Sequence, residues 1–111
     1  MPREPFVTPE PRAFTESLGV EPAETGEGVL ELDLTEVTGE PLRLDFSPLG
    51  GSVRLRRDGL DLYREGATHL RIVETPGRTA LSVDFATGTT TGTLRIEVFP
   101  RVAVRDELLL S

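Results

Sequence analysis

LSVDFATGTTTGTLRIEV, residues 81–98, is the stretch that decides the fold. On both sides of its threonine- and glycine-rich centre, large apolar side chains occupy every second position and polar ones lie between them. Successive side chains of a β-strand point to opposite faces, so this alternation buries one face and leaves the other in water. The stretch therefore predicts two antiparallel strands that each bury one face.

The same alternation continues through most of the chain from residue 29 onward. It is present in residues 30–35, 42–46, 53–56, 60–63, 70–72 and 102–105. Asp58-Gly59 is a strong signal for a two-residue hairpin, and Pro76-Gly77 fits the centre of a type II turn. About eight strands joined by short turns predict an all-β fold, either a jelly-roll-like antiparallel β-sandwich or a flattened barrel. Residues 52–99 are expected to form one five-strand meander.

The first 28 residues differ from the rest, which predicts an N-terminal arm (1–28) followed by a single β-sandwich domain (29–111). The arm is rich in proline and glutamate, and proline interrupts both helix interiors and strand ladders. One short helix fits inside it, because Pro11 suits a first helical turn and Gly19 suits the end. Phe14 and Leu18 lie four residues apart. A helix of two turns is unstable alone, so both side chains are expected to pack on the β-domain.

Composition narrows the classes of partner. The 111 residues carry a formal net charge of -7 and include no cysteine. The charge disfavours nucleic acid and anionic membranes, and it favours a basic protein as partner. Without cysteine there are no disulfides, thiolate metal sites or cysteine nucleophiles. The chain has neither the pattern of a signal peptide nor an apolar run of bilayer length, so we expect it to be cytoplasmic.

Known catalytic motifs are missing from the sequence. The one histidine, His69, falls on the polar side of an expected strand, and no serine sits in a strand-to-helix elbow. One histidine is too few for a usual zinc site, and Gly50-Gly51 precedes a strand, whereas a phosphate loop precedes a helix. We therefore predict no catalytic residue, no cofactor and no metal. Two carboxylates at a suitable separation remain the enzymatic alternative.

Two polar features form the predicted binding site. The first is a set of outward-facing side chains on the expected meander: Arg54, Arg56, Tyr63, Arg71 and Arg95. Arginine and tyrosine are enriched at protein interfaces, although cross-strand ion pairs on a wet face explain the same pattern. The second feature is the polar loop 87–92, from which we select Thr89, Thr90 and Thr91. The loop is longer than a two-residue turn needs, and its alternative interpretation is a solvated hairpin tip.

These observations favour a non-enzymatic protein-binding module. One concrete version is a small inhibitor or an immunity protein, whose negative charge covers a basic site on a toxin. The alternative is a β-sandwich that binds a small molecule or carbohydrate through the 87–92 loop and Tyr63. A third hypothesis is an enzyme or enzyme subunit that uses paired carboxylates. Open sheet edges also invite pairing between chains, which predicts a homodimer through a sheet edge.

Overall fold

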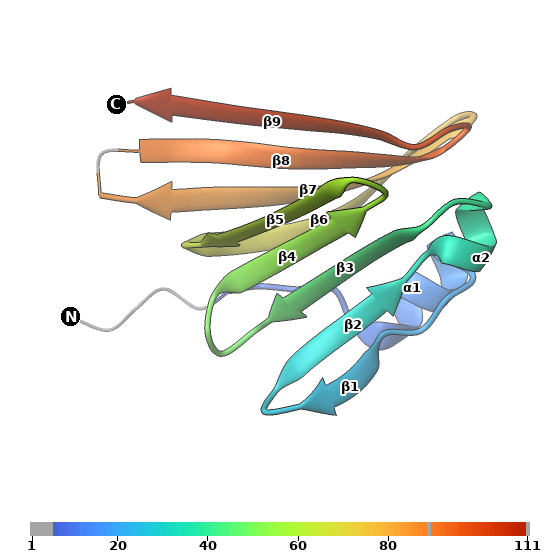
Figure 1. Ribbon diagram of the computed structural model, residues 1–111, viewed down its shortest axis with the longest axis horizontal. Helices are drawn as coiled ribbons and strands as arrows, with labels where there is room; N and C mark the ends of the chain where they lie inside the picture. The colour runs from blue at the N-terminus through green and yellow to red at the C-terminus, as the bar shows by residue number, and fades with distance from the viewer. Residues whose placement is uncertain (1–5, 89, 111) are drawn as a thin grey trace.

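The computed structural model describes residues 6–88 and 90–110, and it shows two antiparallel sheets packed as a sandwich (Figure 1). The five-stranded sheet consists of β1 (Ala23–Gly26), β2 (Val29–Asp33), β3 (Leu42–Ser47), β4 (Ser52–Arg57) and β5 (Leu60–Glu65), in that order. The four-stranded sheet consists of β6 (Ala67–Thr75), β7 (Arg78–Thr87), β8 (Thr90–Phe99) and β9 (Ala103–Leu110). The predicted all-β sandwich is confirmed. Strand order is sequential in both sheets, which differs from the Greek-key order of a jelly roll.

The chain passes from one sheet to the other at Gly66. This corner makes the predicted meander over residues 52–99 wrong, because β4 and β5 belong to one sheet and β6 to β8 belong to the other. Backbone hydrogen bonds hold the corner in both directions. The Ala67 N–H donates to the Gly51 carbonyl at 2.8 Å, and the Ala86 N–H donates to the Gly66 carbonyl at 3.0 Å. Glycine is required here, because its φ of +85° is one that side-chain-bearing residues rarely adopt.

The inward-facing half of each alternating strand builds one core between the sheets. In β3, for example, Leu42, Leu44 and Phe46 are buried while the residues between them are partly exposed. Other fully buried side chains include Leu32, Leu55, Leu70, Leu81, Leu94 and Ile96. The prediction that the alternating apolar residues of each strand face the core is therefore confirmed.

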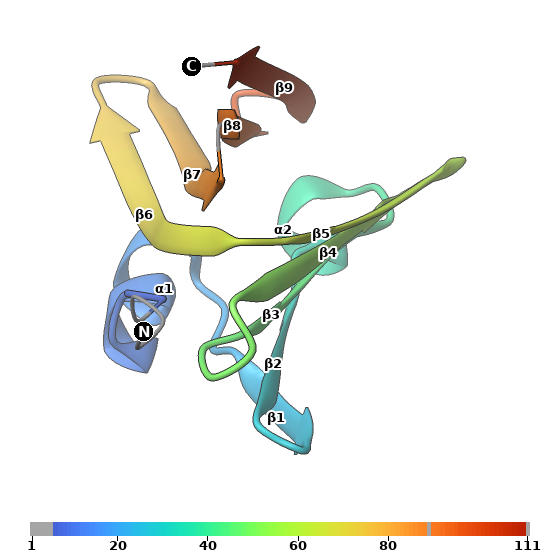
Figure 2. The same cartoon turned by 90° about the vertical axis from the view of Figure 1, so that its left-hand side faces the viewer.

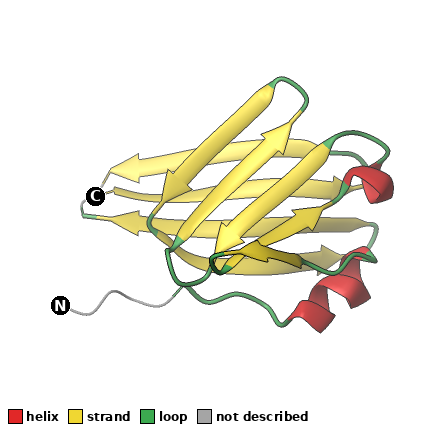
Figure 3. Cartoon of the chain, turned by 60° about the horizontal axis from the view of Figure 1, so that its bottom comes forward, coloured by secondary structure: helices red, strands yellow, loops and turns green. Residues whose placement is uncertain are grey.

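Two short helices, α1 (Pro11–Leu18) and α2 (Thr35–Thr38), lie at the same end of the sandwich (Figure 3). Helix α1 begins and ends where the sequence predicts, and the Gly19 N–H donates to the Thr15 carbonyl at 2.9 Å in a left-handed cap. Phe14 and Leu18 are only 1% and 3% exposed. The Phe14 ring stacks on Phe46 with 5.7 Å between centroids, so the helix depends on the β-body as expected.

Residues 6–28 of the predicted arm contribute to the sandwich in three ways. Val7 lies along the edge of β6, where its N–H donates to Thr68 and its carbonyl accepts from the Leu70 N–H. Helix α1 packs beside β6 (Figure 2), and β1 adds the outermost strand of the five-stranded sheet. Among the described residues, neither helix is long and apolar enough to cross a membrane.

Candidate functional site

The two sheets divide the outward-facing residues predicted as one binding site. Arg54, Arg56 and Tyr63 lie on β4 and β5 of the five-stranded sheet, whereas Arg71 and Arg95 lie on β6 and β8 of the four-stranded sheet. The outer faces of a sandwich point in opposite directions. The single arginine surface expected from a continuous meander is therefore wrong, and the structure has two separate faces in its place.

The outer face of the five-stranded sheet is densely charged, and strand register orders it into rows. We call it the five-strand face and define it by the outward residues of β2 to β5. One row across the strands is Asp33, Arg43, Arg56 and Asp61, and the next is Glu31, Asp45, Arg54 and Tyr63. A third, shorter row is Ser47, Ser52 and Glu65. This arrangement places opposite charges within reach along and between the rows.

Ion pairs on the five-strand face join diagonal neighbours. Arg54 binds Asp61 in a bidentate pair, with Nε–Oδ1 at 2.9 Å and Nη2–Oδ2 at 2.6 Å. These hydrogen bonds hold the pKa of Asp61 below its usual range and raise that of Arg54. Arg56 Nη2 lies 2.6 Å from Asp45 Oδ2 in a more covered pair. Because the carboxylates already engage both predicted arginines, the ion-pair interpretation of Arg54 and Arg56 holds.

Carboxylates outnumber arginines on this face. Arg43 lies 3.6 Å from both Glu31 and Asp33, so two carboxylates share one cation. The three rows together contain three arginines and five carboxylates, which leaves two negative charges in surplus. The pKa of Asp33 is lowered, chiefly by hydrogen bonds from Thr35, so this carboxylate stays charged near neutral pH.

Large apolar side chains are exposed at three places in the described residues, and two of these belong to the five-stranded sheet. Tyr63 is 61% exposed on β5, and Leu49 is 87% exposed in the turn between β3 and β4. Tyr63 faces outward, as the alternation predicts. The third is Val7, at the edge of β6. Exposed aromatic and aliphatic groups among charges are typical contacts for a protein partner.

The rows that cross all four strands on the outer face of the four-stranded sheet hold equal numbers of both charges. We call this outer face the four-strand face and define it by the cross-strand rows that contain Arg71, Asp84, Arg95, Glu97, Arg105 and Glu107. Arg71 forms a close ion pair with Asp84, which also accepts a hydrogen bond from Thr93 at 3.3 Å. Arg95 stands opposite Arg105 across β8 and β9. Three arginines face three carboxylates, so this face has no surplus of charge.

The predicted threonine loop is shorter than expected. Strand β7 continues to Thr87 and β8 begins at Thr90, so most of the expected loop belongs to the two strands. Thr90 and Thr91 are ladder residues opposite Thr87 and Ala86, and Thr89 lies outside the described residues. The prediction of a long polar loop is wrong because threonine is β-branched and fits an extended strand as well as a turn.

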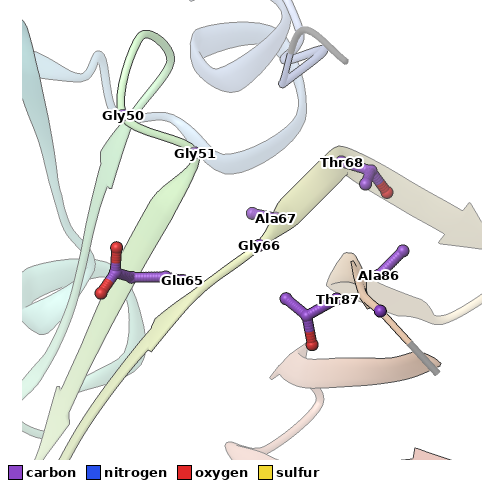
Figure 4. A pocket seen from close by; sticks show the side chains of 9 residues that line it. Gly50, Gly51, Glu65, Gly66, Ala67, Thr68, Ala86 and Thr87 are labelled. Atoms are coloured by element: carbon purple, nitrogen blue, oxygen red, sulfur yellow. The ribbon is translucent and has the colours of Figure 1, made fainter. Parts of the chain in front are cut away.

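A cavity of about 630 Å³ lies at the corner between the two sheets (Figure 4). Its lining is mainly glycine and alanine: Gly50, Gly51, Glu65, Gly66, Ala67, Thr68, Ala86, Thr87 and Gly88. Figure 4 shows the Glu65 carboxylate pointing away from Ala67 and Thr87. In the described part of the chain, no three histidine or carboxylate side chains gather in a way that could hold a metal ion. The cavity at the corner is therefore lined mainly by backbone atoms and small side chains, with few side-chain groups that could bind a ligand or catalyse a reaction.

The acidic residues are concentrated in one segment, a feature that the net charge alone does not predict. Residues 13–42 contain eight of the nineteen acidic residues and none of the twelve arginines. The remaining residues contain eleven acidic residues against twelve arginines, so this single segment accounts for the net charge of -7. In the structure it forms most of α1, then β1, β2 and α2. This run of acidic residues in the sequence predicts an acidic edge of the five-stranded sheet.

Known proteins match this chain through its fold. The chain superposes on a chain from the solved contact-dependent growth inhibition toxin–immunity protein complex from Klebsiella pneumoniae 342. The match has a TM-score of 0.77 and covers 98% of this chain and 100% of that one. The two sequences are 14% identical, so the likeness establishes a shared fold. No protein-family model and no curated protein sequence matches.

Proposed function

We propose that this chain is a non-enzymatic, immunity-type protein that binds a protein toxin and neutralises it in the cytoplasm. The observation that carries the proposal is the fold match, which extends over the whole of the neighbouring chain. That neighbour belongs to a complex of a toxin with an immunity protein. A small sandwich with two extended charged faces is suited to such an assembly, because a rigid sheet presents side chains in a defined array.

Three features favour the immunity role over the toxin role. The chain has a net charge of -7 and no cysteine. Its one histidine, His69, is exposed on β6. Four of the five carboxylates on the five-strand face contact arginines, and the pKa of Asp61 is lowered, whereas a general acid needs a raised pKa.

The other hypotheses receive less support from the described residues. A small-molecule or carbohydrate site at the 87–92 segment has only the glycine- and alanine-lined cavity beside it. A homodimer through a sheet edge stays a prediction, and β1, β5 and β9 are the edge strands to examine, because Val7 covers part of the β6 edge.

A cell-growth assay with the captured partner tests the proposal. The tagged full chain is used to capture its partner from native extract, and the partner is then expressed alone and together with the chain. We expect a stoichiometric partner that arrests growth alone and is harmless when the chain is present. A captured protein that does not affect growth contradicts the proposal. Growth arrest by this chain expressed alone assigns it the toxin role.

A further inference from the structure

We propose that the five-strand face and the adjoining β1–β2 hairpin form the docking surface for a basic surface of the partner protein, with Tyr63 and Leu49 as its apolar contacts. This inference rests on the proposed function for the existence of a protein partner. It adds the location of the interface and the charge of the surface that fits it.

The two outer faces of the sandwich differ in charge. The five-strand face has a surplus of two carboxylates, whereas the four-strand face has none. Its arginines do not repel a cationic partner strongly, because each lies within 3.6 Å of a carboxylate. A basic surface therefore finds uncompensated negative charge on one side of the sandwich and a neutral array on the other.

The acidic segment of residues 13–42 adjoins the five-strand face. Strand β1 is the outermost strand of the five-stranded sheet (Figure 1), and all four of its residues are exposed. Glu24 and Glu27 lie on this hairpin, where Glu24 is opposite Leu30 in the register and Glu27 is in the turn, and Glu31 lies on the five-strand face itself. From residue 13 to residue 42 there is no arginine to offset them. Negative charge is thus concentrated at the exposed β1–β2 edge of the sheet, next to the carboxylates of β2.

Two exposed apolar side chains lie beside the charged residues of this surface. Leu49 lies beside the β1–β2 turn, since a Cβ built on Gly28 would be 3.8 Å from its Cδ1. Tyr63 projects from β5, on the far side of the same face. Leu49 therefore lies near the hairpin, and Tyr63 ends one of the charged rows at β5. Apolar contacts within a field of matched charge give an interface both affinity and orientation.

A nuclear magnetic resonance titration tests the surface without knowledge of the toxin. The ¹⁵N-labelled full chain is titrated with a nona-arginine peptide at low ionic strength, and shifted amides are mapped. We expect the shifts to concentrate on β1 to β5 and to disappear as salt is added, because exposed charges are screened over about 10 Å at 0.1 M salt. Equal shifts on both faces, or shifts centred on β6 to β9, overturn the assignment.

A matched pair of variants tests the surface with the captured partner. Glu24→Gln with Glu27→Gln removes two charges at the hairpin, and Glu97→Gln with Glu107→Gln removes two from the four-strand face. We expect the first pair to raise Kd roughly fivefold or more and the second to change it less than about twofold. Tyr63→Ala is expected to raise Kd about tenfold. Circular dichroism verifies that each variant is folded.

The two proposals fail in different ways. If the partner is harmless to cells but the hairpin variants still weaken binding, the immunity function is wrong and the docking surface stands. If the partner is a toxin but only the Glu97 and Glu107 variant weakens binding, the function stands and the docking surface is wrong. If no partner is captured, the peptide titration alone decides the surface.

Discussion

The five-strand face and the four-strand face are both formed by alternating apolar and polar residues, but they differ in net charge. Both come from strands that alternate apolar and polar residues, and both hold arginines in ion pairs with neighbouring carboxylates. Only the five-strand face keeps a surplus of negative charge and a neighbouring acidic hairpin. Alternation thus determines that a side chain faces water. The partners it meets there depend on which sheet its strand joins.

The largest expected effect comes from loosening the core between the faces. Phe14 extends from α1 into the sandwich and stacks on Phe46, and it is 1% exposed. Phe14→Ala leaves a cavity there and is expected to lower the free energy of unfolding by about 4 kcal/mol. Urea denaturation followed by circular dichroism measures it. An unchanged midpoint would show that α1 does not hold the two layers together.

Next in size is the corner that separates the faces. A Cβ at Gly66 would lie 2.2 Å from Thr87 Cγ2 and would also require a φ of +85° for alanine. Gly66→Ala is expected to cost about 3 kcal/mol, from backbone strain together with the clash. Thr87→Ser in the same chain removes the clashing methyl group and should restore part of the loss.

The control for this corner is Gly77→Ala. Gly77 also has a positive φ, but a Cβ there meets no atom within 4 Å. The expected cost is therefore only about 1 kcal/mol. Equal losses for the two variants would show that crowding at the corner is unimportant.

A smaller effect is expected from the ion pair that joins the two sheets. Arg64 on β5 binds Asp106 on β9 through two contacts of 2.5 and 2.6 Å, and its guanidinium lies 5.2 Å from the centre of the Phe85 ring. Hydrogen bonds from Arg64 hold the pKa of Asp106 below its usual value of 3.8. Asp106→Asn is expected to cost about 1 kcal/mol at neutral pH.

The pH dependence of that pair follows from the direction of the shift. Because the pKa of Asp106 is lower in the folded chain, its stabilisation is complete above the unfolded pKa and is lost as pH falls from about 4 through the folded value. The wild type should therefore lose more stability than Asp106→Asn when pH is lowered from about 6 to about 3. Parallel loss in both proteins, measured by urea midpoints, would contradict a role for this pair.

The smallest expected effect is at the surface pair on the five-strand face. Arg54 and Asp61 have side chains that are 46% and 53% exposed, so water screens their attraction. Asp61→Asn is expected to lower Tm by less than about 3 °C. It also frees the Arg54 charge, which should weaken binding of a basic partner. A large fall in Tm would show that this face is built for stability.

Local chemistry explains what the sequence could predict. Helix α1 follows from neighbouring residues: Pro11 at its start, Gly19 at its end, and Phe14 and Leu18 on one side. The buried phase of each strand follows from period-two alternation. The acidic segment of residues 13–42 is also a local feature of the sequence, which the net charge of the whole chain does not reveal.

Contacts between distant residues explain what the sequence could not predict. Glu65-Gly66 is equally compatible with a hairpin and with a corner between sheets. Which of the two forms depends on the hydrogen bonds that the corner makes with Gly51 and Ala86. These residues are up to about twenty positions away in the sequence. That corner assigned Arg71 and Arg95 to a different face from Arg54 and Arg56. The residues that make up each outer face can therefore be assigned only when the structure is known.

The measurement that tests the account most directly is growth rescue by three versions of the chain against the captured partner. We predict that the wild type and the Glu97→Gln, Glu107→Gln variant restore growth at low expression, whereas the Glu24→Gln, Glu27→Gln variant needs higher expression. The matched variants differ only in which side of the sandwich loses charge. Equal rescue by all three, or rescue by none, would contradict neutralisation through the five-strand face and its hairpin.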